Sequence, residues 1–399
     1  MTDGPNDRNW GALLKWSLAQ TDDGNTAGVV GESTDTDIAQ LPLRQITEED
    51  RKWFVQAMQN GMVDEIKRMK DITQALAVDS DAVLETQEDI DARLTLMEEL
   101  NDRVCSVDNG GDLHTIGGLV PVVNTLRSPH ASLRSAAAEV IGTTVQNHSK
   151  AQLAAVECEC VKPLLAMVQG EGGDAPPKAV ENTIVSDDKN VLVAALETCR
   201  VKALLGLSSL TRGCSLAVAN LINERGISAL KHALESSSPM VKQSDANANT
   251  QLISLIKKAK TKAIHVARHL CVMSDGVMSN VVDAELLLSA CDALTSAIPS
   301  FGFLAGDWSD KTRKSEKTNM SSESIQSGQL REAALRFLLD VAQCVDFEKC
   351  PKALDDLRSE KCVAAINTVG RWYATFDAEE RETHQDEMTV CAELAKMFG

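Results

Sequence analysis

Residues 133–147 read LRSAAAEVIGTTVQN, and three later stretches align with them without gaps. These are CRVKALLGLSSLTRG from Cys199, AKTKAIHVARHLCVM from Ala259 and LREAALRFLLDVAQC from Leu330. Apolar or small residues recur at offsets 0, 4, 7 and 8 from the first residue of each stretch, which is the spacing of one buried helical face. One aligned position is alanine in all four stretches: Ala137, Ala203, Ala263 and Ala334. The pattern predicts four long helices of one repeated kind.

A shorter apolar helix is predicted before each long one, in the segments GGLVPVVNTLRS, CVKPLLAMVQG, GISALKHALESS and AELLLSACDALTSAI. Polar inserts separate the last three pairs at residues 170–189, 236–250 and 306–328, and we expect these inserts to be disordered. Without an insert of roughly 20 residues, each unit approaches the armadillo or HEAT length of about 40–47. We therefore expect an all-α fold, a right-handed α-solenoid of about four armadillo/HEAT-like repeats with helical caps.

The same pattern divides the chain into four parts. We expect residues 1–46 to form a flexible arm, because residues 20–40 are mostly Asp, Thr, Gly and Ser and have little to bury. A helical N-terminal cap is expected over residues 47–107, the repeats over 108–350 and a helical C-terminal cap over 351–399.

Composition limits the function classes. The chain has 399 residues and a formal charge of −18, so it lacks the basic surface that general nucleic-acid binding requires. No run approaches the roughly 18 apolar residues of a membrane-spanning helix, and MTDGPNDRNW is not a secretory signal. The 11 cysteines lie mostly in helical patterns, which favours buried, reduced thiols in a cytoplasmic protein.

No catalytic, cofactor or metal site is predicted. The sequence has no Gly-rich phosphate loop, no GxSxG elbow and no HExxH motif. His265 and His269 are spaced to chelate a metal from one helix, but no third ligand accompanies them. A solvated or partner-facing histidine pair is the favoured interpretation.

The second residue of every long helix is basic: Arg134, Arg200, Lys260 and Arg331. One interpretation is a solvated position whose aliphatic stems cover apolar neighbours. The other is a row of cations along a binding groove, aimed at an acidic partner. Periodicity alone favours the first.

The N-terminal segment LLKWSLA also has two interpretations. Leu13, Leu14, Trp16 and Leu18 could pack on the folded body at helical spacing. Alternatively, a short apolar and basic stretch on a flexible tether suits the peptide groove of a chaperone.

Several of these segments occur together in one known family. LLKWSLA, EEDRKWFVQAM, VDEIKRMKDIT, SVDNGGDLHTIGGLVPVVNTL, SLRSAAAEVIGTTVQN and CRVKALLGLSSLTRG follow one another in the family's order over residues 10–170 and 190–275. The sequence thus resembles the cytosolic, armadillo-type nucleotide exchange factors of the 70-kDa heat-shock chaperone.

The resemblance implies a monomeric co-chaperone without an active site of its own. Its concave face would grip one lobe of the chaperone's ATPase domain, open the nucleotide cleft and release ADP. Its N-terminal arm, with LLKWSLA, would compete for the chaperone's peptide-binding domain and so release substrate. The alternative from the residues alone is a passive armadillo scaffold that binds another protein or peptide in the same groove.

The resemblance also marks individual positions as partner-binding. Gly110 falls in a loop that is commonly Asp-Asn-Ala-x-Asp-Leu in the family and is more glycine-rich here. Asn147 matches an asparagine that ends the first long helix. Basic family positions match residues of the second and third long helices: Arg200, Lys202, Arg212 and Lys262.

Overall fold

The computed structural model describes residues 52, 65–77, 86–170, 189–235, 246–273, 281, 285–298, 322–344 and 346–398, and all regular structure among them is helical. The chain divides into two compact units, residues 1–68 and 69–399. Of the first unit only residue 52 and residues 65–68 are described, so the predicted arm 1–46 lies outside the described residues. Nearly all of the described helices belong to the second unit.

The helices of the first half are α3 (Glu65–Leu76), α4 (Gln87–Val104), α5 (Val107–Thr115), α6 (Leu119–Thr125), α7 (Ala131–Thr144), α8 (Ser149–Glu157), α9 (Val161–Gln169), α11 (Lys189–Thr211), α12 (Ser215–Asn223) and α13 (Gly226–Glu235). Those of the second half are α14 (Ala246–Met273), α16 (Leu286–Ser296), α18 (Ser322–Cys344), α19 (Pro351–Arg358), α20 (Glu360–Ala374), α21 (Ala378–Thr383) and α22 (Gln385–Phe398). None of these described helices combines the length and apolarity that a membrane span requires.

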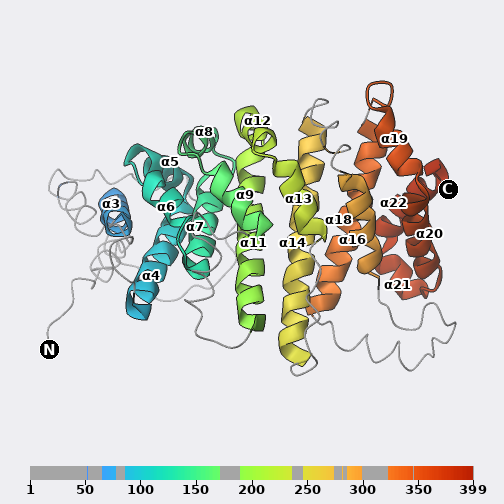
Figure 1. Cartoon of the computed structure of the whole chain (residues 1–399), viewed down its shortest axis with the longest axis horizontal. Helices are drawn as coiled ribbons and strands as arrows, with labels where there is room; N and C mark the ends of the chain where they lie inside the picture. Colours follow the sequence, from blue (N-terminus) through green and yellow to red (C-terminus); the bar gives the residue numbers. More distant parts are fainter. Residues whose placement is uncertain are drawn as a thin grey trace, which may run out of the picture. The chain divides into compact units, whose positions relative to one another are not determined.

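The long helices α7, α11, α14 and α18 pack side by side in chain order, and we call this set the long-helix layer (Figure 1). The helix α4 packs on α7 at one end of the layer, and α22 packs on α18 at the other. A second series is formed by the shorter helices α9, α13, α16 and α20, in which each helix contacts the next. This two-layer stacking is an armadillo-type α-solenoid, as the repeat pattern predicts.

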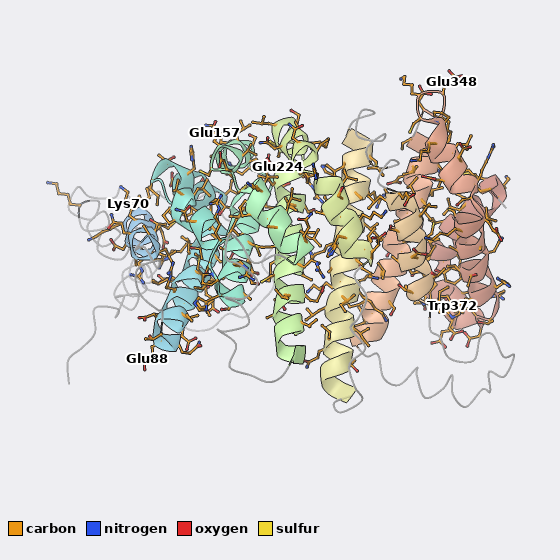
Figure 2. The ribbon with its side chains drawn as sticks, viewed as in Figure 1. Lys70, Glu88, Glu157, Glu224, Glu348 and Trp372 are labelled. Carbon is orange, nitrogen blue, oxygen red and sulfur yellow. The ribbon has the colours of Figure 1, made fainter. Side chains whose placement is uncertain are left out.

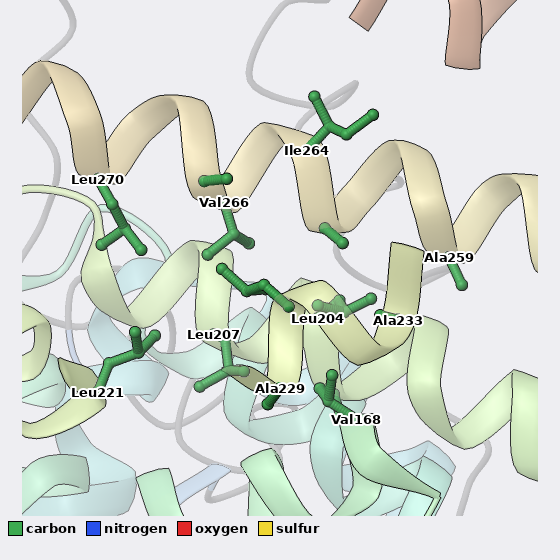
Figure 3. Close-up of a cluster of buried hydrophobic side chains, with 14 of the residues drawn as sticks. Val168, Leu204, Leu207, Leu221, Ala229, Ala233, Ala259, Ile264, Val266 and Leu270 are labelled. Atoms are coloured by element: carbon green, nitrogen blue, oxygen red, sulfur yellow. The ribbon is translucent and has the colours of Figure 1, made fainter. Parts of the chain in front are cut away.

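The predicted buried face of the long helices is confirmed. The residues at its four offsets are all buried, from Leu133 and Ala137 in α7 to Phe337 and Leu338 in α18. Figure 3 shows how neighbouring helices share this core, with Leu204 and Leu207 of α11 gathered near Val266 of α14. Each long helix therefore depends on its neighbours for most of its apolar burial.

Two helices of the repeat were not predicted. α8 and α12 follow α7 and α11 directly, so that α8–α9–α11 and α12–α13–α14 are three-helix armadillo units. The chain reverses before each of them at a left-handed residue, Asn147 with φ 56° and Gly213 with φ 78°. At α8 the Nδ1 atom of His148 then accepts a hydrogen bond from the Ala151 amide at 3.0 Å. Both helices have nine residues, and their starts lack the usual Ser, Thr or Asp cap.

The helices α14 and α18 begin earlier than expected. Their first residues, 246 and 322, lie inside the predicted inserts 236–250 and 306–328, so these inserts end sooner than the sequence indicated. In α14 the buried residues Leu252 and Ile256 continue the apolar face of Ala259 towards the N-terminus. A hydrogen bond of 2.8 Å from Lys257 Nζ to Ser327 Oγ joins α14 to the first turns of α18.

Two glycines bring the neighbouring long helices α7 and α11 close together. A Cβ atom placed on Gly142 of α7 would lie 3.3 Å from the Cα atom of Gly206 in α11. A Cβ atom on Gly206 would lie 3.3 Å from the carbonyl oxygen of Ala138. The backbones of α7 and α11 can pack this closely because glycine has no side chain at these two positions.

We expect the substitution Gly226→Ala to destabilise the fold. A Cβ atom at Gly226, the first residue of α13, would lie 2.4 Å from Leu221 Cδ2 and 2.7 Å from the Leu221 carbonyl oxygen. Relief of this overlap requires a backbone shift, with an expected loss of about 1–3 kcal/mol in the free energy of unfolding. Urea denaturation measures it. Gly328→Ala is the matched control, because its Cβ would be 3.8 Å from the nearest atom, Arg331 Nη2, and helical alanine should be neutral or stabilising. Equal stabilities for the two variants would contradict the prediction.

The C-terminal helices surround a buried ion pair. Arg331 Nε of α18 donates to Glu387 Oε2 of α22 at 2.8 Å, and the Tyr373 hydroxyl of α20 donates to the same oxygen at 2.5 Å. The Arg331 guanidinium also lies 4.3 Å from the ring centroid of Trp372, which Figure 2 labels on α20. This Arg331–Glu387 network joins three helices at the end of the solenoid.

Candidate partner-binding surface

Helical geometry separates the buried residues of the long-helix layer from the open ones. Successive residues of an α-helix turn by roughly 100°, so offsets 3, 6 and 10 share one side of the helix, which borders the buried offset 7. We call the surface at offsets 3, 6 and 10 the open face of the layer. It carries Glu139 of α7, Lys202 of α11 and Lys262 and His265 of α14. Offset 1, the predicted basic position, lies outside this open face and points in nearly the same direction as the buried offset 8.

The arginines at offset 1 are buried, which contradicts both sequence interpretations of them. Arg134 is 1% exposed, and its Nη1 atom donates to the carbonyl oxygens of Ser128 and Pro129 at 2.8 and 2.9 Å. These carbonyls belong to the turn between α6 and α7. Arg134 is therefore occupied inside the fold and is not available to a partner.

Arg200 and Arg331 are buried in the same way. Arg200 is 5% exposed, pairs with Glu197 and donates from Nε to the carbonyl oxygen of Val168, in the last turn of α9, at 2.7 Å. A cation at that helix end satisfies a free carbonyl and the helix dipole. Arg331, at 3% exposed, belongs to the Arg331–Glu387 network. These side chains join the two helical layers and are neither solvated nor partner-facing.

Lys260 is the exception at offset 1, since it is half-buried and has no hydrogen bond or ion pair within the described residues. Burial lowers its pKa, against the opposing effect of Asp292 and Glu197. It therefore lies at the margin of the surface, beside acidic neighbours.

The other predicted partner-binding residues divide into two groups. Lys202, Lys262, Arg212 and Asn147 are partly or fully exposed, and Lys202 Nζ lies 2.5 Å from Glu139 Oε1 of α7. Gly110 is buried instead: a Cβ there would lie 3.3 Å from the Thr144 carbonyl oxygen. Its small size thus serves the packing of α5 on α7.

A pocket of about 440 Å³ opens between α14 and α18. Its lining contains four cationic side chains beside His265 and Glu332: Lys258, Lys262, Arg268 and Arg336. Arg336 pairs with Glu332 at 2.8 Å, and Arg268 pairs with Asp340. Sequence reasoning missed Lys258, Arg268 and Arg336, although the exposed offsets of the repeat could have identified Arg336.

Lys258 and Lys262 supply the uncompensated charge of this pocket. Within the described residues no ion pair joins either lysine to a carboxylate. Burial lowers the pKa of Lys262, and the charges of Lys258 and Lys202 lower it further. The pKa of His265 is lowered by burial and then by Arg268 and Lys262. Mutual repulsion of this kind is relieved when an anionic group binds, so the α14–α18 pocket suits an acidic partner surface.

The pocket contrasts with the rest of an acidic chain. Exposed glutamates such as Glu157 of α8 and Glu224 after α12 project from another edge of the helices (Figure 2). With a net charge of −18, the concentration of cations on α11, α14 and α18 is a local exception. Such separation of charge orients a partner during association.

Within the part of the chain that the structure describes, no group of three or more His, Cys, Asp or Glu residues could hold a metal ion. His265 belongs to the cationic pocket. The pKa of His269 is lowered chiefly by burial and by Arg212. The described residues thus offer a binding surface as their candidate site.

Comparison with known proteins finds sequence relatives over part of the chain and structural neighbours by fold. A family model described as nucleotide exchange factor Fes1 matches residues 11–113. The Hsp70 nucleotide exchange factor FES1 of Mycosarcoma maydis is 26% identical over 176 residues, 44% of this chain and 43% of that protein. Hsp70-binding protein 1 of Mus musculus is 26% identical over 201 residues, 49% of this chain and 50% of that protein. The chain spans about half the length of these curated relatives, or less.

The similarity to solved structures concerns the fold alone. An engineered protein from the Northeast Structural Genomics Consortium superposes with a TM-score of 0.51 at 13% identity, covering 84% of this chain and all of that one. A designed armadillo repeat protein gives a TM-score of 0.49 at 12% identity, covering 82% of this chain and 99% of that one. The sequence comparisons agree with the resemblance drawn from the motifs.

Proposed function

We propose that this chain, which resembles the Fes1-type nucleotide exchange factors of Hsp70, is itself such a factor. It binds the ATPase domain of the 70-kDa chaperone through the open face of the long-helix layer and accelerates ADP release. The observation that carries the proposal is the Fes1 family match over residues 11–113, continued by armadillo repeats. The cationic α14–α18 pocket supports it, because it provides a contact for an acidic partner.

The proposed mechanism is differential binding. An exchange factor shifts the ATPase domain towards an open, ADP-poor state only if it binds that state more tightly than the closed one. A tenfold preference corresponds to about 1.4 kcal/mol, which a few charged contacts can supply. Side chains held on packed helices favour one partner geometry, because their rearrangement would disturb the core. The factor therefore needs no nucleotide site and acts as a co-chaperone, not as an enzyme.

The direct test is the rate of ADP release. We expect substoichiometric amounts of the full chain to accelerate loss of a fluorescent ADP from the chaperone's ATPase domain, since each molecule can act repeatedly. Stopped-flow fluorescence with excess unlabelled ATP measures the rate, and bovine albumin at equal concentration is the control. Tight binding with an unchanged ADP off-rate would instead support the alternative, a passive armadillo scaffold.

A second test concerns the N-terminal arm, which lies outside the described residues. Replacement of Leu13, Leu14, Trp16 and Leu18 by serine should leave ADP release intact but slow the departure of a labelled peptide from the chaperone. Each apolar side chain can contribute roughly 1.5–3 kcal/mol to a peptide groove before ordering costs. Tethering to a bound clamp raises the local concentration towards the millimolar range, so weak affinity suffices. Unchanged peptide release, or a loss of thermal stability, would contradict this role.

We further propose that the factor works as a monomer in the cytoplasm without cofactor or metal. These points follow from the family resemblance and from the composition, and size-exclusion chromatography with light scattering tests the first. A dimer at micromolar concentration would require a revised account of the open face.

A further inference from the structure

Two cysteines face each other between α16 and α20. Cys291 lies near the middle of α16 and Cys362 in the first turn of α20, and these two helices pack together. Both side chains are 1% exposed. The two thiols also interact with each other across this helix contact.

Residues next to the two cysteines hold α16 and α20 in the same alignment. Lys361 Nζ lies 2.7 Å from Asp292 Oδ2, which pairs the residue before Cys362 with the residue after Cys291. Ser359 caps α20, and its hydroxyl accepts a hydrogen bond from the Cys362 amide at 3.2 Å. The helix start and its cap therefore hold Cys362 against Cys291.

The pair is chemically asymmetric. The Cys291 thiol donates to Cys362 and thereby lowers the pKa of Cys362, although burial and Asp356 oppose the shift. The same hydrogen bond, with burial, raises the pKa of Cys291. Lys361 and Asp292 act on Cys291 in opposite directions. The first turn of a helix also favours a thiolate at Cys362, so Cys362 is the nucleophile of the pair.

We propose that Cys291 and Cys362 form an oxidation site at which a peroxide converts the two thiols into a disulfide between α16 and α20. The Cys362 thiolate attacks one oxygen of the peroxide, breaks the O–O bond and becomes a sulfenic acid, while hydroxide leaves. Cys291 loses its proton to that hydroxide and attacks the Cys362 sulfur. The S–S bond forms as the sulfenic oxygen departs and takes up a proton as water. In total, two thiols and hydrogen peroxide give one disulfide and two waters.

The burial of both sulfurs sets the conditions for this reaction. Oxidant must enter through local opening of the C-terminal helices, so the pair should react more slowly than the exposed thiols Cys105 and Cys344. Those two are free, exposed thiols and should stop at sulfenic or higher acids. The product would join helices that are far apart in sequence and restrict the unfolded chain.

The test is peptide mapping of the full chain after exposure to hydrogen peroxide. Free thiols are blocked with iodoacetamide under denaturing conditions, and the protein is digested without reductant. We expect one dominant cross-linked peptide pair containing Cys291 and Cys362, lighter by two hydrogen atoms than the sum of its peptides and separated by dithiothreitol. If both residues are recovered as separate carbamidomethyl or sulfonic peptides, or if another pairing dominates, the proposal is overturned.

Variants and melting give a second measurement. Peroxide should raise the Tm of the wild type by several degrees, and dithiothreitol should reverse the rise. Cys362→Ser should abolish the rise and the cross-link. Cys214→Ser is the matched control, because Cys214 is buried at the N-cap of α12, where serine is favourable, and it should preserve both effects. If Cys362→Ser does not fold, wild-type mapping alone decides the question.

Discussion

Replacement of Glu387 by alanine is expected to lower the free energy of unfolding by about 3–5 kcal/mol, because it leaves the Arg331 guanidinium buried without its counter-charge. The two side chains are 4% and 12% exposed, and their atoms lie 2.8 Å apart. The Tyr373 hydroxyl loses its acceptor in the same variant. Urea denaturation at pH 7 measures the loss. Glu382→Ala, at an exposed position on α21, is the matched control and should stay within about 0.5 kcal/mol of the wild type.

This loss should depend on pH in a defined direction. Burial alone would raise the pKa of Glu387, but hydrogen bonding from His384 and the charge of Arg331 hold it at about 2, below its ordinary 4.5. A carboxylate with a depressed pKa stabilises the fold fully above 4.5 and progressively less as the pH falls towards 2. The stability difference between wild type and Glu387→Ala should therefore shrink between pH 5 and about pH 2. A constant difference over that range would contradict the ion-pair explanation.

The double charge reversal Lys258→Glu with Lys262→Glu is expected to weaken binding to the Hsp70 ATPase domain by about 2 kcal/mol or more, at least 30-fold in Kd. These lysines supply the uncompensated cations of the α14–α18 pocket. An acidic partner would then face two carboxylates in place of two ammonium groups. Folding should change little, because exposed or half-exposed charges contribute under about 1 kcal/mol each. Isothermal titration calorimetry measures the affinity, and circular dichroism checks the helices.

The control for this experiment is Lys150→Glu with Lys162→Glu. It makes the same change in net charge at exposed lysines of the short helices α8 and α9, outside the long-helix layer. We expect its Kd to stay within a factor of about three at physiological salt. If both double variants lose affinity equally, net charge and not the open face governs binding. Arg200 is unsuitable for such a test, since its reversal would break the buried pair with Glu197.

The buried face was predictable from sequence because a 3.6-residue period recurs in four aligned stretches. The prediction for the basic position was wrong at its three arginines, which are buried, whereas Lys260 is only half-buried. At offset 1 the side chain starts on the same side of the helix as the buried offset 8 and is long enough to reach carbonyls or a carboxylate outside its own helix. Only the packing of the two layers reveals those partners.

The candidate site was predictable in part. Lys202 and Lys262 followed from the resemblance and lie on the open face. Arg268 and Arg336 did not, because the pocket arises only where α14 meets α18, across a long insert in the sequence. The helices α8 and α12 were missed because their starts lack a typical cap and their burial depends on neighbouring units.

The paired glycines Gly142 and Gly206 limit how far this protein can be treated as modular. Duplication of a unit is a natural route to a longer repeat protein, and it requires every copy to fit every neighbour. A copy of α14 placed after α7 would bring Val266, the counterpart of Gly206, against the backbone at Gly142 and Ala138, where even a single added Cβ would come within 3.3 Å. The backbones would have to separate, and contacts along the rest of the helix pair would be lost. The order of the repeats is therefore fixed at this junction, and an inserted copy would be tolerated more readily between α14 and α18.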